Sequence, residues 1–319
     1  MMKQLNNNEL PEHIVKQVEK IEQQYNKNIE LYSDYSDQQF LTLDQASHES
    51  NDDVIKVVIT NEKFSEFVLS HELHHIELEL SDEPEIDSAV TSGKSDFDGR
   101  VLSIANSVFE TLEHVLVVKL QKEDGTFSDE IKKEYLKGVE AALHPKVELD
   151  RANMRFYRTL IMFDGIIFGE HEFDDDWKHE FPKSFKYASH LAEIAEKDDL
   201  TVPFKFRRAL VNALDAYNEV IISNGYEGLH FHTFLNITPI ISKRQLRLSL
   251  NQVYQIKHSE YKNRATGKDG FVLIAINDGQ GIATLNLDPV KVTPEFYKAF
   301  YQYTVEDVFD KEGIKYLIR

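Results

Sequence analysis

The hydrophobic pattern in the first third of the chain predicts a strand followed directly by a helix. Residues 54–60 are mostly β-branched, which is typical of a strand. Asn61 can cap a helix that continues to about Leu80, before the polar residues 81–84 end it. With a turn of about 100° per residue, hydrophobic side chains occupy two opposite sides of this helix and leave a narrow polar stripe. We therefore expect a helix that is buried on two faces.

A second hydrophobic helix is predicted over residues 97–122. Before the strand, the pattern predicts a polar amphipathic helix over residues 10–27 and a further strand over residues 39–43, with residues 47–53 as an acidic loop. After the second helix, helical patterns continue over residues 128–143, 150–168, 183–197 and 204–223. The first 225 residues are thus expected to form a helix-rich body with a small sheet.

After Gly225 the sequence pattern changes from helix-like to strand-like. Residues 244–251, 252–258 and 271–277 have the composition of strands, and residues 262–270 form a turn-rich linker between the last two. We therefore expect an α+β protein with two parts: a helix-rich domain over residues 1–225 and a β-containing C-terminal part over residues 226–319.

Composition narrows the classes of function. The chain has 319 residues and a formal net charge of −19, which argues against binding nucleic acid. Its lack of cysteine excludes disulfides and thiolate metal sites. The start has no apolar signal core, and no uninterrupted apolar run is long enough to span a membrane. We expect a soluble, cytoplasmic protein that does not associate with membranes.

The first hydrophobic helix contains the motif His71-Glu72-Leu73-His74-His75. His71 and His75 are four residues apart and therefore lie on one face of the helix, close enough to bind one metal ion. Glu72 flanks that face and can accept a proton from water at the metal. His74 lies to the side and is interpreted as a bystander. The motif therefore predicts a metal site with an adjacent general base.

This strand, the helix and the H-E-x-x-H motif resemble the zincin metallopeptidase superfamily, over about residues 38–122. The resemblance implies a zinc-dependent hydrolase that cleaves a peptide bond in a protein or peptide substrate. It implies that His71 and His75 bind Zn²⁺ and that Glu72 is the catalytic residue. Narrow cleavage of an intracellular regulatory protein is the expected role.

A catalytic zinc site usually has three protein ligands, so a third is expected from the second hydrophobic helix. Glu110, Glu113 and His114 lie on its polar side and each has a suitable donor atom. Glu110 followed by His114 resembles the gluzincin E-x-x-x-D pattern, in which the Glu binds the metal, with His in place of Asp. Glu110 is preferred and His114 is next, but the residues alone leave all three open.

Two other classes of function fit parts of the same pattern. Glu72 and His75 also form the E-x-x-H motif of carboxylate-bridged di-iron proteins, although the chain has no second copy. A binding protein that keeps the helix pair without catalytic activity is the other alternative. Metal content separates the three hypotheses, because they predict one zinc, two irons or no metal.

A second resemblance involves the C-terminal half. Asn212 on a predicted helix and the segment Asn277-Asp278-Gly279-Gln280-Gly281 resemble the Asn-bearing helix and D-x-G-x-G loop of GHKL ATPases. Arg208 stands where that family has a catalytic Glu, and Asn277 stands where it has the Asp that reads adenine. We interpret this segment as a turn between strands and do not expect ATP binding.

Overall fold

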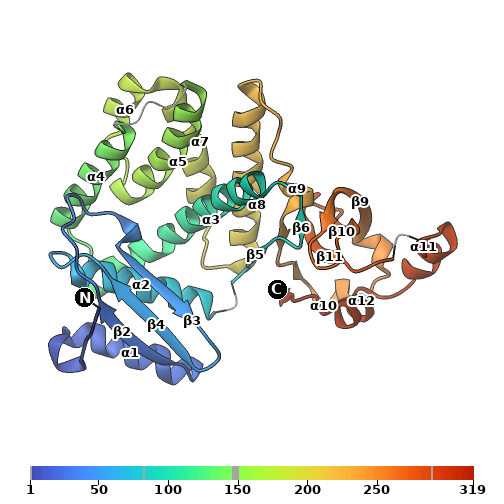
Figure 1. Cartoon of the computed structure of the whole chain (residues 1–319), viewed down its shortest axis with the longest axis horizontal. Helices are drawn as coiled ribbons and strands as arrows, with labels where there is room; N and C mark the ends of the chain where they lie inside the picture. The colour runs from blue at the N-terminus through green and yellow to red at the C-terminus, as the bar shows by residue number, and fades with distance from the viewer. Residues whose placement is uncertain (1, 82, 146–150, 289) are drawn as a thin grey trace. The chain divides into compact units, whose positions relative to one another are not determined.

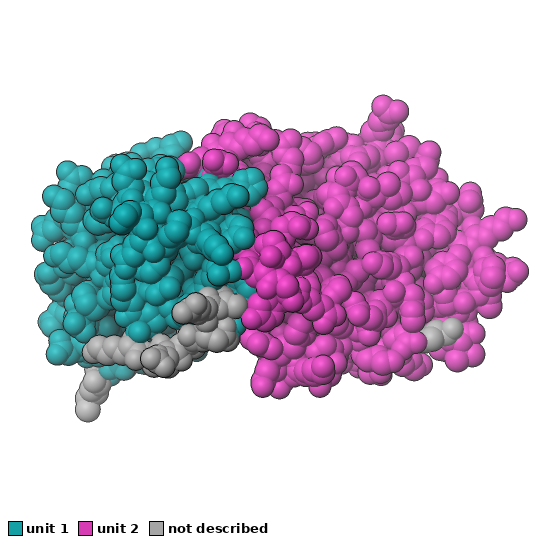
Figure 2. Space-filling model, turned by 90° about the horizontal axis from the view of Figure 1, so that it is seen from above, with its two compact units in different colours: residues 1–83, 113–192 teal, residues 84–112, 193–319 magenta. Residues whose placement is uncertain are grey.

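The computed structural model describes residues 2–81, 83–145, 151–288 and 290–319 (Figure 1). Helices predominate and the strands form small sheets, which confirms the α+β class. The chain divides into two compact units (Figure 2): a first unit of residues 1–83 and 113–192, and a second of residues 84–112 and 193–319. This division differs from the boundary expected at residue 225, because residues 84–112 and 193–225 belong to the second unit.

The first unit contains a four-stranded sheet in the order β1-β2-β4-β3. The strands are β1 (Lys3–Gln4), β2 (Asn28–Ser33), β3 (Ala46–Ser50) and β4 (Val54–Ile59). β2 and β4 are parallel, and the two outer pairs are antiparallel. The strand predicted over residues 54–60 is confirmed as β4.

Two predictions around this sheet were wrong. Residues 39–43 do not form a strand, and β3 occupies most of the expected acidic loop. The side chain of Asn51 accepts hydrogen bonds from the backbone N–H groups of Asp53 and Val54, at 3.1 and 2.8 Å. This turn joins β3 to β4 as a hairpin. Because β3 is an edge strand with mostly exposed side chains, its sequence is polar and lacks the hydrophobic alternation that predicts strands.

One face of this sheet supports the helix that carries the motif. Buried and half-buried residues alternate along β4, with Ile55, Val57 and Ile59 buried. Helix α2 (Ser65–Glu79) packs against β3, β4 and helix α1 (Glu12–Tyr25). Every residue of α2 from Phe67 to His74 is buried, as the two-sided hydrophobic pattern predicted. The side chain of Asn61 accepts a hydrogen bond from the N–H of Phe64 just before α2 begins.

Helix α3 (Ser95–Asp124) confirms the second hydrophobic helix and contributes residues to both units. It is the one described helix that is long and apolar enough to cross a membrane, with a mean hydropathy of 1.4 over 18 residues. However, 56% of that window is buried inside the protein. α3 is therefore a core helix of the fold. This agrees with the expectation of a soluble chain, whereas the cytoplasmic location remains a prediction.

Three of the remaining helices of the first unit confirm helical patterns of the sequence, whereas a fourth was not predicted. The confirmed helices are α4 (Asp129–Leu143), α5 (Arg151–Gly169) and α7 (Pro182–Glu196), whose last residues belong to the second unit, and the helix that was not predicted is α6 (Asp174–Glu180). Ser128 caps α4 by accepting a hydrogen bond from the N–H of Ile131. The buried residues of α5 include Phe163 and Phe168. Phe168 of α5 reaches α3, where its ring centroid lies 6.4 Å from that of His114.

The second unit combines helix α8 (Pro203–Ser223) with an antiparallel sheet. The sheet has the order β11-β10-β9-β6 and consists of β6 (Val90–Thr91), β9 (Tyr254–Asn263), β10 (Asp269–Ala275) and β11 (Gly281–Leu285). Shorter elements complete the unit: β5 (Ile86–Asp87), α9 (Phe231–Phe234), β7 (Asn236–Ile237), β8 (Ile240–Ile241), α10 (Lys243–Leu246), α11 (Pro294–Phe300), α12 (Val305–Glu312) and β12 (Leu317–Ile318). The strand expected over residues 244–251 is wrong, because Ser242 and Gln245 form a capping box that begins α10.

The segment that resembles the GHKL loop is a turn between β10 and β11, as interpreted from the sequence. Asp278 forms an ion pair with Arg207 of α8. The buried amide of Gln280 donates a hydrogen bond to the carbonyl of Leu235 at 2.9 Å. A side chain at Gly281 would collide with the backbone carbonyls of His232 and Leu235. These contacts give Asp278, Gln280 and Gly281 structural roles in the turn.

Candidate metal centre

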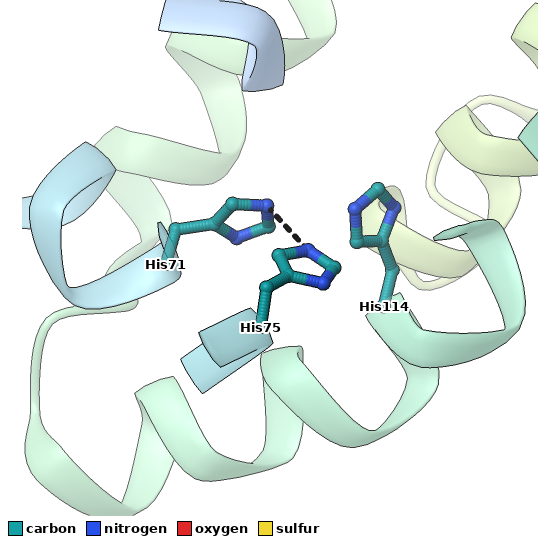
Figure 3. Close-up of side chains that lie close together, drawn as sticks. All are labelled: His71, His75 and His114. Carbon is teal, nitrogen blue, oxygen red and sulfur yellow. Dashed lines mark hydrogen bonds between the residues drawn. The ribbon is translucent and has the colours of Figure 1, made fainter. Parts of the chain in front are cut away.

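Three histidines of the first unit meet in its interior. His71 and His75 project from α2, and His114 projects from α3 (Figure 3). The ring centroids are 4.7 Å apart for His71 and His75, 5.0 Å for His71 and His114, and 5.1 Å for His75 and His114. One nitrogen from each ring lies within 4.8 Å of the other two. Among the described residues, this is the one group of histidines and carboxylates arranged closely enough to bind a metal ion.

The Nδ1 atom of His71 is directed at an amide oxygen. It lies 3.2 Å from Oε1 of Gln121. The amide nitrogen of Gln121 donates to the carbonyl of Phe67 at 3.1 Å, and this contact fixes which end of the amide faces His71. Oε1 can only accept, so we infer that Nδ1 of His71 carries the proton. Its Nε2 atom is then left with a lone pair.

The Nδ1 atom of His75 is held by a carboxylate. It lies 3.1 Å from Oε2 of Glu113, which is buried on α3. Burial, and next the charge of Glu113, raises the pKa of Glu83 to about 8. At neutral pH Glu83 is therefore protonated, and the Glu113 side chain accepts the hydrogen bond from Nδ1 of His75. Nε2 of His75 is again left with a lone pair.

The third ring has a similar partner. Nδ1 of His114 lies 2.5 Å from Oδ1 of Asp164 on α5, and the hydroxyl of Tyr135 on α4 donates to the other carboxylate oxygen of Asp164. Burial, and then the charge of Asp164, raises the pKa of Tyr135 well above its ordinary value, so the phenol stays protonated and donates. Asp164 therefore accepts from both side chains, and one nitrogen of His114 lies within 4.8 Å of a nitrogen on each of His71 and His75.

These hydrogen bonds determine what the cluster can do chemically. The Nε2 atoms of His71 and His75 are 3.2 Å apart, and with both Nδ1 atoms protonated no hydrogen lies between them (Figure 3). Two lone pairs facing each other repel, and a cation held between them removes that repulsion. A metal-binding histidine usually donates its other ring N–H to a carboxylate or carbonyl group. All three histidines meet this requirement, so the residues fit a metal ion.

The charge state of the rings also suits a metal. Burial, and then the imidazoles of His75 and His114, lowers the pKa of His71 well below its ordinary value. Burial, followed by His114, lowers the pKa of His75 to about 3. Both rings are therefore neutral at physiological pH, which is the form of imidazole that binds metals.

Aromatic side chains exclude water from one side of the cluster. The ring centroid of Phe168 lies 6.3 Å from that of His71 and 6.4 Å from that of His114. The ring centroid of Phe67 lies 5.9 Å from that of His71. Tyr135 packs on Phe168 at 4.4 Å. An apolar wall of this kind strengthens electrostatic interactions at the site.

Glu72 lies beside the histidines and is held by a residue of the sheet. Its Oε1 atom is 2.7 Å from Nδ1 of His48 on β3, and Nε2 of His48 is 2.7 Å from Oε2 of Glu79. Among the described residues, none hydrogen-bonds to Oε2 of Glu72. The hydrogen bonds that His48 donates to Glu72 and then to Glu79 raise the pKa of His48 to about 9. His48 is therefore an imidazolium at neutral pH, and Glu72 keeps one oxygen for another partner.

The structure distinguishes among the residues predicted for the third ligand. It places His114 with His71 and His75, and it places Glu113 beside His75 as a hydrogen-bond acceptor. Glu110, the preferred residue, is exposed and is not part of the cluster. Glu72 lies next to the cluster, and His74 instead bonds to Asp124 at 2.9 Å.

Sequence reasoning did not find four residues that support the cluster. Gln121 follows His114 by seven residues on the same helical face, and Asp164 is the lone acid in the apolar stretch of α5. Both patterns are visible in the sequence and could have been used. His48 and Tyr135 had no such signal, because their contacts join segments that are distant along the chain.

Comparisons with known proteins add no family assignment. No protein-family model, curated protein or solved structure shows a significant match to the chain. Any function must therefore be argued from the geometry of the site.

The pKa of His48 predicts how stability of the metal-free protein changes with pH. Since this pKa is raised from 6.5 in the unfolded chain to about 9 in the folded protein, the stabilisation is complete below pH 6.5 and is lost as pH rises through about 9. We expect the free energy of unfolding to fall between about pH 7 and 9.5, by at most about 3 kcal/mol. His48→Gln should lose much of this pH dependence in denaturant titrations. Equal pH dependence in both proteins would contradict the assignment.

Proposed function

We propose that the protein is a zinc-dependent metallopeptidase whose metal is held by His71, His75 and His114. The observation that carries the proposal is the convergence of three imidazoles whose Nδ1 atoms all face acceptors, with Glu72 beside them. Three histidines with one open position is a known arrangement for catalytic zinc. The H-E-x-x-H motif, through its resemblance to zincins, supports a peptide bond as the target.

The donor set favours zinc over the di-iron alternative. Imidazole nitrogen suits zinc, whereas carboxylate-bridged iron needs several carboxylate ligands around two ions. In the described part of the chain, the nearest carboxylates of the site are already engaged: Glu113 with His75, Asp164 with His114, and Glu72 with His48. A single ion on nitrogen ligands accounts for each of these contacts.

A zinc ion bound to the three rings would polarise a carbonyl group and lower the pKa of bound water toward about 7. The protein's own residues supply the rest. Gln121, Glu113 and Asp164 orient the rings, so the three Nε2 atoms need little rearrangement. Oε2 of Glu72 accepts a proton from the attacking water and passes it to the leaving amine. The aromatic wall keeps bulk water away from one side of the cluster.

The ligand assignment predicts which substitutions remove the metal. Ala at His71, His75 or His114 should each abolish stoichiometric zinc binding, because each removes one of three ligands. Glu110→Ala is the matched control on α3 and should keep its zinc, since Glu110 is exposed. Glu113→Ala should weaken affinity by roughly 10–100-fold, as expected for loss of a residue that orients a ligand. Elemental analysis and competition with a zinc chelator measure both effects. Full zinc content in His114→Ala would refute the third ligand.

Glu72→Gln separates an enzyme from a binding protein. The substitution keeps size and removes the basic carboxylate, so the variant should retain zinc while hydrolysis falls by roughly 10²–10⁴-fold. Hydrolysis of an unfolded protein substrate and zinc content should be measured together in wild type and variant. A di-iron site predicts instead that the metal is lost, because Glu72 would be a ligand. Unchanged hydrolysis by a zinc-loaded variant would rule out the proposed role of Glu72.

A further inference from the structure

His48 connects the proposed proton acceptor to the edge of the sheet. It pairs with Val57 across β3 and β4, and directly opposed residues of two strands point to the same face. Val57 is buried on the face that packs against α2, so the ring of His48 is also directed at α2. There it lies between Glu72 and Glu79, which are seven residues apart on one side of the helix. The ring thus bridges two turns of α2.

The two contacts of this ring are equal in length, but the two carboxylates differ in solvent exposure. Both distances are 2.7 Å, and an imidazolium donates a charge-assisted hydrogen bond through each nitrogen. The side chain of Glu79 is 56% exposed, whereas that of Glu72 is 11% exposed. Glu79 therefore anchors the ring at the surface, and Glu72 is the buried group that the ring holds.

A buried carboxylate next to three metal-binding imidazoles can compete with water for the metal. Carboxylate oxygen is itself a common zinc ligand, and a Glu that occupied the fourth position would exclude the water that a catalytic site requires. Nothing in the motif prevents this, because Glu72 lies on the same part of α2 as His75. The hydrogen bond from His48 occupies Oε1 and restricts the rotation of the carboxylate.

We propose that His48 is a positioning residue that holds Glu72 off the metal, so that the carboxylate remains a proton acceptor and does not become a fourth ligand. This inference rests on the metal site proposed above. It assigns a catalytic purpose to a histidine outside the H-E-x-x-H motif, and it makes β3 part of the site.

Two substitutions of His48 separate positioning from charge. Both His48→Asn and His48→Gln remove the imidazolium, but the shorter Asn amide reaches the place of Nδ1 and the longer Gln amide reaches that of Nε2. Asn can therefore still donate to Glu72, whereas Gln can donate only toward Glu79. Cobalt(II) substituted for zinc gives a visible spectrum that reports the number and type of ligands. The same spectrum measured on His48→Gln/Glu72→Gln shows whether any change depends on the Glu72 carboxylate.

We expect wild type, His48→Asn and the double variant to share one cobalt spectrum. His48→Gln alone should show a different spectrum and bind zinc more tightly, because Glu72 joins the ligands. His144→Gln is the matched control, since His144 forms a similar pair with Glu180 at 2.7 Å in the same unit, and it should match wild type. Identical spectra for wild type and His48→Gln would overturn the role of His48 alone. Failure of wild type to bind cobalt would instead contradict the metal site and this inference with it.

Discussion

Three imidazoles packed together in a protein interior impose the constraint on which the rest of the first unit depends. Each ring has a donor and an acceptor nitrogen, and both need partners when water is excluded. The protein supplies an acceptor for each Nδ1 atom, from Gln121, Glu113 and Asp164. The Nε2 atoms of His71 and His75 face each other at 3.2 Å, and one nitrogen of His114 lies within 4.8 Å of a nitrogen on each of them. A metal ion is the partner that we propose for this arrangement.

Two helices, α2 and α3, carry the three histidines, and neighbouring elements hold these helices in place. The sheet and α1 pack against α2, while α4 and α5 bring Tyr135 and Asp164 to α3. Each carboxylate beside the cluster also has a partner of its own. Glu83 is held protonated beside Glu113, Tyr135 donates to Asp164, and His48 neutralises Glu72. Without these pairs, the buried carboxylates would repel one another.

The parts predicted from sequence are those with local, periodic signals. The strand β4, the helices α2 and α3 and the His71–His75 pair all follow from hydrophobic period and residue spacing. β3 was missed because an exposed edge strand carries no hydrophobic alternation, and His48 was missed with it. The choice of His114 over Glu110 depends on the rotation of α3 against α2. Spacing along one helix cannot determine that rotation, since both residues lie on the polar side of the predicted helix.

Zinc-edge X-ray absorption of the purified, zinc-loaded protein tests the central claim most directly, because it reports the atoms bound to the metal. The account predicts one zinc per chain with a first shell of about four nitrogen or oxygen atoms at about 2.0–2.1 Å. It also predicts the outer-shell scattering of three imidazole rings, which His114→Ala should reduce to that of two. A spectrum with one or no imidazole, or one unchanged by that substitution, would contradict a metal centre built from His71, His75 and His114.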